Sequence, residues 1–182
     1  KAAIETDSYK WISSLYLDGQ GEGTTTGDHV ECTDENDDFD FGTESFTIDL
    51  WLRSNCTSNT GVLDRATGDN TEPWMIYAVG ATFGFYGSSN GTSFDIANNV
   101  NMGTCNANTW DHYAVTSNGS FLMTFQNGIN IANQSYSLSF RDLTNTNLSI
   151  GVRSTSWNYY AGYFDELRII KRITLRRGWE KK

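Results

Sequence analysis

Proline, long apolar runs and closely spaced metal ligands are all scarce in this sequence. Its 182 residues include one proline, which excludes a proline-rich linker or recognition segment. The longest apolar stretch, residues 74–86, is interrupted by two glycines and a threonine and is too short to cross a bilayer. We therefore expect no membrane insertion.

Cysteine is present in an odd number. The chain contains Cys32, Cys56 and Cys105, and no two of them have the Cys-x-x-Cys spacing of a structural zinc site. Three cysteines allow one disulfide within the chain and leave one thiol over. The sequence does not choose among the three pairings.

Charge is unevenly divided along the chain, whose formal net charge is −9. Residues 1–170 carry 7 basic and 21 acidic side chains, whereas residues 171–182 carry 6 basic and 1 acidic. Nucleic-acid binding needs clustered lysine and arginine, so an acidic body of this kind predicts no nucleic-acid partner. The basic tail is expected either to meet an acidic partner or to be a solvated extension.

What the sequence does contain is typical of an all-β domain. Aromatic residues make up 14% of the chain, and clusters of glycine, asparagine, serine and threonine separate short apolar runs. The apolar side chains of Phe46, Ile48, Leu50 and Leu52 alternate with more polar neighbours, which is the period of a half-buried strand. The strands predicted in this way are 13–18, 29–32, 46–53, 61–66, 74–79, 82–86, 93–97, 110–116, 120–126, 129–134, 148–152 and 162–170.

Two Asn-Gly pairs predict tight hairpins. Asn118-Gly119 and Asn127-Gly128 each separate two predicted strands, and Asn-Gly tolerates the positive φ angles of a tight hairpin turn. The three strands around them should form an antiparallel meander. About a dozen short strands do not fit one open sheet, so we predict two antiparallel sheets packed face to face in a jelly-roll sandwich. We assign residues 1–12 to a lead-in, 13–171 to this domain and 172–182 to the basic tail.

Several blocks, in order along the chain, resemble the motifs of laminin-G-like, concanavalin A-like jelly-roll domains. They are Leu17-Asp18-Gly19, Asp38–Trp51 (DFDFGTESFTIDLW), Trp110–Thr116 (WDHYAVT), Gln126-Asn127-Gly128, Ile150-Gly151 and Gly162–Ile169 (GYFDELRI). The resemblance implies the fold, whereas the superfamily includes both lectins and glucanases and leaves the activity open. The residue patterns of the Asp38–Trp51 and Gly162–Ile169 blocks are most similar to those of modules in bacteriophage virion proteins. Such modules are associated with adsorption to a host surface.

The carboxylates and histidines argue against an enzyme. A retaining glucanase needs two carboxylates about 5 Å apart, which related glucanases place on one strand as Glu-x-Asp-x-x-Glu. This triplet is missing: Asp49 stands alone in its strand, and the adjacent Asp165 and Glu166 are expected on opposite faces. Neither His29 nor His112 has a neighbouring serine or cysteine in a nucleophile-elbow sequence.

Calcium is the cofactor that the resemblance raises. Asp69 and Asn70 resemble an Asp-Asn pair that binds calcium in pentraxins, and their oxygens suit a hard cation. The second half of that site is not matched, because Arg153 stands in the corresponding region and would repel a cation. An alternative acidic cluster offers many oxygens but lacks the fixed spacing of a known calcium loop, so a solvated turn is the better interpretation; it consists of Asp34, Glu35, Asp37, Asp38 and Asp40.

Sugar binding needs aromatic rings for the apolar sugar faces and amides or carboxylates for the hydroxyls. The segment at residues 156–160 supplies both and should lie at one end of a sheet. The predicted ligand contacts are Trp157, Asn158, Tyr159, Tyr160 and Trp74. The competing interpretation is that these rings cap the core or cover a sheet edge. Trp51 and Trp110 are expected in the core or between the sheets.

These observations favour a non-catalytic module that binds a glycan or a host-surface receptor, located in a virion or outside the cell. The competing class is a structural decoration domain of a capsid or tail that has no glycan ligand and contacts other virion proteins through its basic tail. A polysaccharide-cleaving enzyme is the third interpretation, and the missing carboxylate pair disfavours it.

Overall fold

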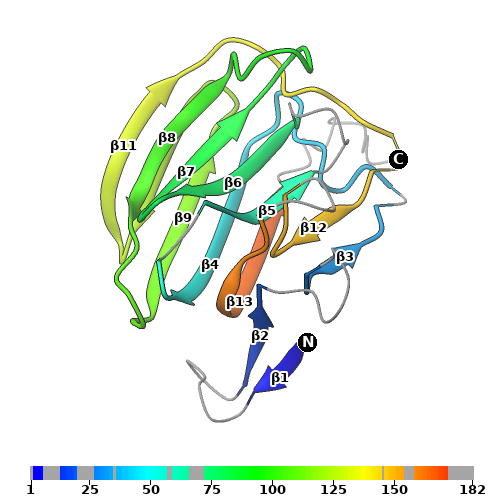
Figure 1. Ribbon diagram of the computed structural model, residues 1–182. Coiled ribbons are helices and arrows are strands. Elements are labelled where there is room, and N and C mark those ends of the chain that lie inside the picture. Colours follow the sequence, from blue (N-terminus) through cyan, green and yellow to red (C-terminus); the bar gives the residue numbers. More distant parts are fainter. Residues whose placement is uncertain are drawn as a thin grey trace, which may run out of the picture.

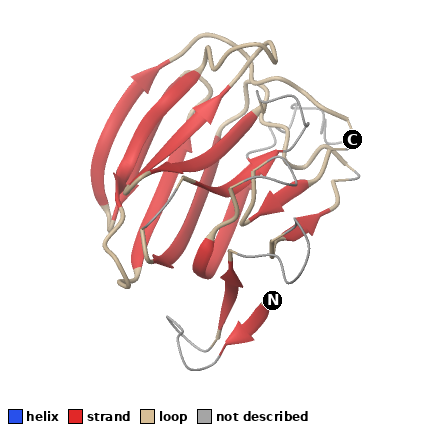
Figure 2. Cartoon of the chain, viewed as in Figure 1, coloured by secondary structure: helices blue, strands red, loops and turns tan. Residues whose placement is uncertain are grey.

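Every element of the computed structural model is a β-strand within the residues it describes (Figure 2). Those residues are 2–5, 13–19, 27–34, 36–56, 59–65, 72–144, 146–153 and 158–171. The strands form two antiparallel sheets that lie face to face, as the alternating patterns predict (Figure 1). The described part of the chain has no helix that could span a membrane.

One sheet has seven strands in the order β1-β2-β13-β4-β9-β10-β11. Their bounds are β1 Ala3–Glu5, β2 Ser14–Asp18, β13 Ala161–Lys171, β4 Phe46–Ser54, β9 Asp111–Ser117, β10 Phe121–Gln126 and β11 Ile129–Ser135. Strands from the beginning, middle and end of the sequence therefore lie side by side at its centre.

The other sheet has six strands in the order β3-β12-β5-β6-β7-β8. Their bounds are β3 Val30–Cys32, β12 Leu148–Ile150, β5 Thr60–Arg65, β6 Trp74–Val79, β7 Thr82–Gly87 and β8 Ala97–Thr104. Figure 1 shows β5 to β8 of this sheet lying over β4 and β9 of the first.

The core fills the space between the two sheets. The four alternating apolar residues of β4 all point inward and are at most 2% exposed, as the sequence pattern predicts. Aromatic rings close one end of this core, where the Phe41 ring stacks on Phe46 at 4.0 Å and on Trp74 at 5.0 Å between centroids. Burial of these large side chains is the main stabilising contribution of the sandwich.

Most predicted strands are confirmed to within two residues, but two differences occur. The predicted strand 93–97 is wrong: the strand is Ala97–Thr104. Residues before it form a polar turn in which the Asp95 carboxylate accepts hydrogen bonds from the Ser89 amide at 2.8 Å and hydroxyl at 2.6 Å. The strand β8 itself is rich in asparagine and lacks a strong apolar alternation. The short strand β1 was not predicted.

The two Asn-Gly turns differ. Asn127 and Gly128 have φ angles of 50° and 79°, so both adopt the left-handed conformation that the hairpin prediction requires. At the other turn only Gly119, with φ of 94°, has a positive angle. Both turns nevertheless connect the antiparallel strands of the predicted meander.

The disulfide joins Cys56 to Cys105, and Cys32 is the free thiol. Cys56 follows β4 of the seven-stranded sheet, and Cys105 follows β8 of the six-stranded sheet. The bond therefore ties the two layers together at one end of the sandwich.

Candidate functional site

Aromatic side chains gather on the outer face of the seven-stranded sheet. Tyr163 in β13 is paired with Tyr16 in β2 on one side and with Arg53 in β4 on the other. Directly paired residues of an antiparallel sheet point to the same face, so these three side chains form a row across the strands. They lie opposite Phe164 and Leu52, whose side chains are in the core.

The row is tightly packed. The Tyr16 and Tyr163 ring centroids are 4.8 Å apart, and the Arg53 guanidinium carbon lies 5.4 Å from the centre of the Tyr163 ring. Trp110, just before β9, extends the row, since its ring lies 6.2 Å from that of Tyr163. All four side chains are half-buried, so their rings are fixed in place while part of each faces solvent.

Beside this row is a groove of about 280 Å³, which we call the Tyr163 groove. Its lining combines tyrosine rings with amide, carboxylate, hydroxyl and guanidinium groups: Tyr16, Asp18, Arg53, Ser54, Asn55, Asn108, Ala161, Gly162 and Tyr163. Flat rings next to converging polar groups are the chemistry that a sugar requires, because a sugar has apolar C–H faces and hydroxyl edges.

The disulfide and backbone hydrogen bonds fix the loops at the end of this groove. The Asn108 amide donates to the Ser54 carbonyl at 2.7 Å, and Arg53 Nε donates to the Asn108 carbonyl at 2.9 Å. The Cys56–Cys105 bond lies close by in sequence on both loops. Asn108 is thus held in place at the groove, and Asn55 lies in sequence between Ser54 and the disulfide-bonded Cys56.

The predicted ligand contacts are not brought together. Trp74 and Tyr160 are both 0% exposed, so neither can stack on a ligand. Trp74 opens β6 with its indole N–H donating to the Phe39 carbonyl at 2.8 Å, and Tyr160 packs on Phe164 with centroids 4.5 Å apart. For Trp74 and Tyr160 the competing interpretation, in which the rings belong to the core, is therefore confirmed.

The other members of that prediction lie at the rim or outside the described residues. Asn158 is exposed and donates a hydrogen bond from Nδ2 to the Tyr77 hydroxyl at 2.9 Å. Tyr159 is half-buried, with its ring 6.1 Å from that of His29. Trp157 lies outside the described residues. Asn158 and Tyr159 therefore remain a second, smaller candidate.

Trp51 and Trp110 were expected inside, and this expectation is wrong. Trp51 lies between the inward residues Leu50 and Leu52, so the pleat turns it to the outer face. Trp110 lies in the row with Tyr163. The alternation of β4, in which Trp51 falls between two inward-pointing leucines, is the sequence signal that predicts its outer position.

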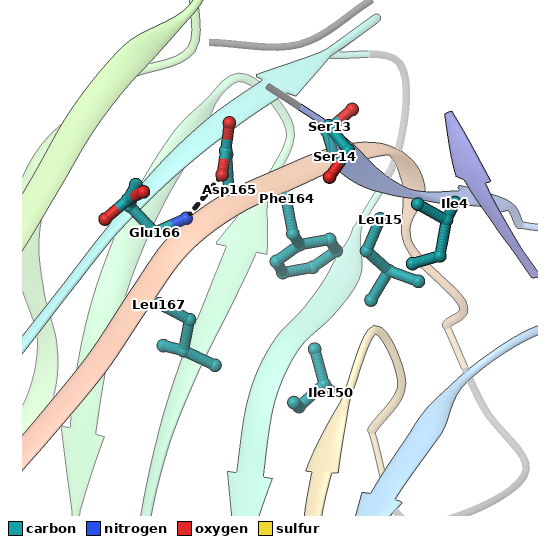
Figure 3. Close-up of a pocket in the computed structure, with 9 residues that line it drawn as sticks. All are labelled: Ile4, Ser13, Ser14, Leu15, Ile150, Phe164, Asp165, Glu166 and Leu167. Atoms are coloured by element: carbon teal, nitrogen blue, oxygen red, sulfur yellow. Dashed lines mark hydrogen bonds between the residues drawn. The ribbon is translucent and has the colours of Figure 1, made fainter. Parts of the chain in front are cut away.

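A second pocket, of about 230 Å³, opens on the opposite face of the same strands (Figure 3). Its floor consists of apolar side chains that include Leu15, Phe164 and Leu167, and it leads toward the core. Asp165 and Glu166 lie on the other side of the β13 ribbon from these residues, and the Glu166 amide donates to Asp165 Oδ1 at 2.8 Å (Figure 3). This pocket is therefore an opening between the layers, separate from the Tyr163 groove.

Of the two candidate calcium sites predicted from the sequence, the structure describes residues of only one. Asp69 and Asn70 lie outside the described residues. In the alternative acidic cluster, Asp34 and Asp40 are buried and both bind the fully buried Arg65, at 2.9 Å and 2.7 Å. Arg65 supplies the positive charge that these two carboxylates need, so they do not fit a cation site.

Asp37, Asp40 and Asp142 have carboxylate oxygens within 4.8 Å of one another. Asp40 is committed to Arg65 and to the Leu143 amide, at 3.3 Å, and it also shares a hydrogen bond with Asp142. Burial, followed by that hydrogen bond to Asp142, raises the pKa of Asp40 from 3.8 to about 6, while Arg65 opposes the rise.

Replacing Asp142 with asparagine is expected to change how stability depends on pH. Folded Asp40 keeps its proton up to about pH 6, whereas the unfolded side chain loses it near 3.8, so stability falls as pH rises through this interval. The substitution Asp142→Asn removes the neighbouring negative charge. It should flatten the dependence and raise the free energy of unfolding at pH 7 by on the order of 1 kcal/mol.

Urea denaturation at pH 4, 5, 6 and 7 measures this effect. Asp95→Asn is the matched control, because Asp95 is an exposed aspartate whose pKa is shifted in the opposite direction. Burial is the largest single effect and raises its pKa, but the hydrogen bonds that Asp95 accepts, chiefly from Ser89, together lower it. An unchanged slope between pH 4 and 6 in Asp142→Asn would contradict the assignment.

Two antiparallel sheets of seven and six strands, packed face to face, define the fold class as a jelly-roll-like β-sandwich. The family model of the concanavalin A-like lectin/glucanases superfamily matches residues 24–175. The chain belongs to this superfamily, as its motifs indicate. No curated protein matches the sequence.

Solved structures show the same fold at low sequence identity. Domain 4 of AbnA, a GH43 extracellular arabinanase from Geobacillus stearothermophilus, solved with arabinotriose, superposes with a TM-score of 0.66 and 16% identity over 94% of this chain and 75% of that one. The binding domain of Paraclostridial Mosquitocidal Protein 1 gives 0.70 and 14% over 94% of this chain and 42% of its own.

The binding domain of Botulinum neurotoxin DC is a third relative in fold. Its complex with rat synaptotagmin II gives a TM-score of 0.67 and 15% identity over 93% of this chain and 41% of that one. The same domain has been solved with SialylT. This chain thus spans about two fifths of the toxin binding domains.

Proposed function

We propose that this chain is a non-catalytic carbohydrate-binding module whose ligand lies in the Tyr163 groove. The observation that carries the proposal is the row of half-buried Tyr16, Tyr163 and Trp110 rings beside the amide and guanidinium groups of the groove. The rings would stack on apolar sugar faces, and the polar groups would exchange hydrogen bonds with hydroxyls.

The relatives in fold support a binding role. One is the domain solved with arabinotriose, and another has been solved with SialylT and with a protein, rat synaptotagmin II. Catalysis is disfavoured because Asp18 is the one carboxylate among the described residues that line the Tyr163 groove, whereas glycoside hydrolysis commonly needs two. We extend the proposal to a module that adheres to a host surface from a virion or another extracellular particle.

Replacing Tyr163 with alanine is expected to weaken glycan binding by about tenfold or more. Losing a stacked ring removes both apolar contact and the platform that orients Arg53, and about 1.4 kcal/mol corresponds to a factor of ten. A glycan array that includes arabinotriose and sialylated oligosaccharides identifies the ligand, and titration calorimetry measures its affinity. Tyr163→Phe should keep the affinity within about threefold, since the ring remains.

Tyr159→Ala is the control, because it removes an aromatic ring from the rim candidate and leaves the groove intact. A loss of binding in Tyr159→Ala with normal binding in Tyr163→Ala would move the site to the rim. Silence on the array, combined with detachment from a particle after deletion of residues 171–182, would favour the structural decoration domain.

A further inference from the structure

The outer face of β13, β4 and β9 carries a second row of ligand-competent side chains beyond the Tyr163 groove. Asp165 in β13 is paired with Trp51 in β4, which is paired with His112 in β9. These residues follow the first row by two positions along their strands, a step of roughly 7 Å. That step is comparable with the length of one sugar residue in an extended chain.

The second row repeats the chemistry of the first. The Trp51 ring lies 5.2 Å from the His112 ring at an interplanar angle of 55°, and both side chains are half-buried. Trp51 is also a diagonal neighbour of Tyr163, within reach across the strands. A ring platform therefore continues from the groove along the sheet.

A rigid polar network borders this platform. Asp49, of which 8% of the side chain is exposed, accepts hydrogen bonds from Arg168 Nη2 at 2.8 Å and Nε at 3.1 Å. His112 Nε2 lies 3.3 Å from the same Asp49 oxygen. Arg168 is 64% exposed, so it presents a guanidinium that is held in one orientation and already paired with a carboxylate.

A β-bulge places Arg168 at this position. The pairing of β13 with β4 shifts between Asp165 and Arg168, where Glu166 has a φ of 50°. The shift brings Arg168 opposite Asp49.

We infer that the module binds an internal segment of a neutral, linear glycan chain, with one subsite in the Tyr163 groove and a second over Trp51 and His112. This inference rests on the proposed function and names its ligand class. A linear chain fits because the two rows follow one another along the strands. A neutral chain fits because the protein has a net charge of −9 and Asp49 already neutralises Arg168.

The test uses ladders of arabino-, xylo-, cello- and malto-oligosaccharides of one to six residues, titrated into the wild-type chain. We expect affinity for the recognised ladder to rise about tenfold between the shortest bound member and the trimer or tetramer. Trp51→Ala should abolish this rise while leaving the Kd of the shortest member within about twofold. Trp51→Phe should restore part of the rise.

Phe121→Ala is the matched control, because it truncates a 37% exposed ring on β10 of the same sheet. Affinity that does not grow with chain length, or growth that persists in Trp51→Ala, overturns the second subsite while the proposed function stands. If none of the ladders binds and the glycan array shows binding only to charged or branched glycans, the ligand class is overturned. Failure of every glycan to bind overturns the proposed function itself.

Discussion

Replacing Arg65 with alanine is expected to lower the free energy of unfolding by about 3–5 kcal/mol. Arg65 ends β5 and is 0% exposed, with Asp34 and Asp40 as its two carboxylate partners. Its guanidinium also donates to the carbonyls of Thr146 and Leu143. Removing it leaves two buried carboxylates without a counter-charge and two carbonyls without a donor.

The network holds together segments that are distant in sequence. The Asp34 carboxylate accepts a hydrogen bond from the Asp38 amide at 2.8 Å, so it shapes the turn that leads to Asp40. Arg65 connects this turn to the carbonyls of Leu143 and Thr146. Loss of Arg65 should therefore loosen both segments as well as remove an ion pair.

Denaturant and thermal unfolding measure the effect, and the melting temperature should fall by about 6–20 °C for a chain of this size. Arg65→Lys keeps the charge but loses the planar fork, so it should be intermediate. The triple variant Asp34→Asn, Asp40→Asn, Arg65→Met removes all the charges together and should recover part of the loss. A cost below about 1 kcal/mol for Arg65→Ala would show that the network contributes little.

Features that are determined by residues adjacent in sequence, such as strands and tight turns, can be predicted from this sequence. The alternation from Phe46 to Leu52 predicts a strand and its buried face, because side-chain direction in a strand follows from position alone. The Asn127-Gly128 turn is likewise determined by its own two residues. The order of motifs along the chain predicts the superfamily.

The groove could not be predicted in the same way because it depends on long-range register. Tyr16, Arg53 and Tyr163 are far apart in sequence, and only the order β2-β13-β4 brings them into one row. The sequence predicts a ligand site at residues 156–160 instead, because aromatic rings and an amide are neighbours there along the chain. Burial of Tyr160 is decided by its packing on Phe164, a contact that composition does not reveal.

The acidic segment illustrates the same difficulty with charge. Asp34 and Asp40 resemble a solvated or calcium-binding turn when they are considered alone. Their partner, Arg65, lies 25 or more residues away and reaches them only after β5 is in place. A single buried arginine therefore supplies the positive charge that this acidic segment, considered alone, would require from a bound cation.

Removing the Cys56–Cys105 disulfide is expected to cost about 2–4 kcal/mol and to weaken glycan binding at the same time. The bond joins residues 49 apart in sequence, so it restricts the unfolded chain substantially. It also lies next to the loops that present Asn55 and Asn108 to the Tyr163 groove. The paired substitution Cys56→Ser, Cys105→Ser should therefore lower the melting temperature and raise the Kd for the array-identified glycan.

Cys32→Ala is the matched control, because Cys32 is a half-buried free thiol in β3, in the other sheet from the groove strands. It should cost about 1 kcal/mol or less and leave the affinity unchanged. Dithiothreitol should reproduce the effect of the double substitution in the wild type and have none on the variant. If the double variant loses stability but binds normally, the disulfide stabilises the sandwich without positioning the groove, and the Ser54–Asn108 and Arg53–Asn108 hydrogen bonds suffice to hold the Asn108 loop.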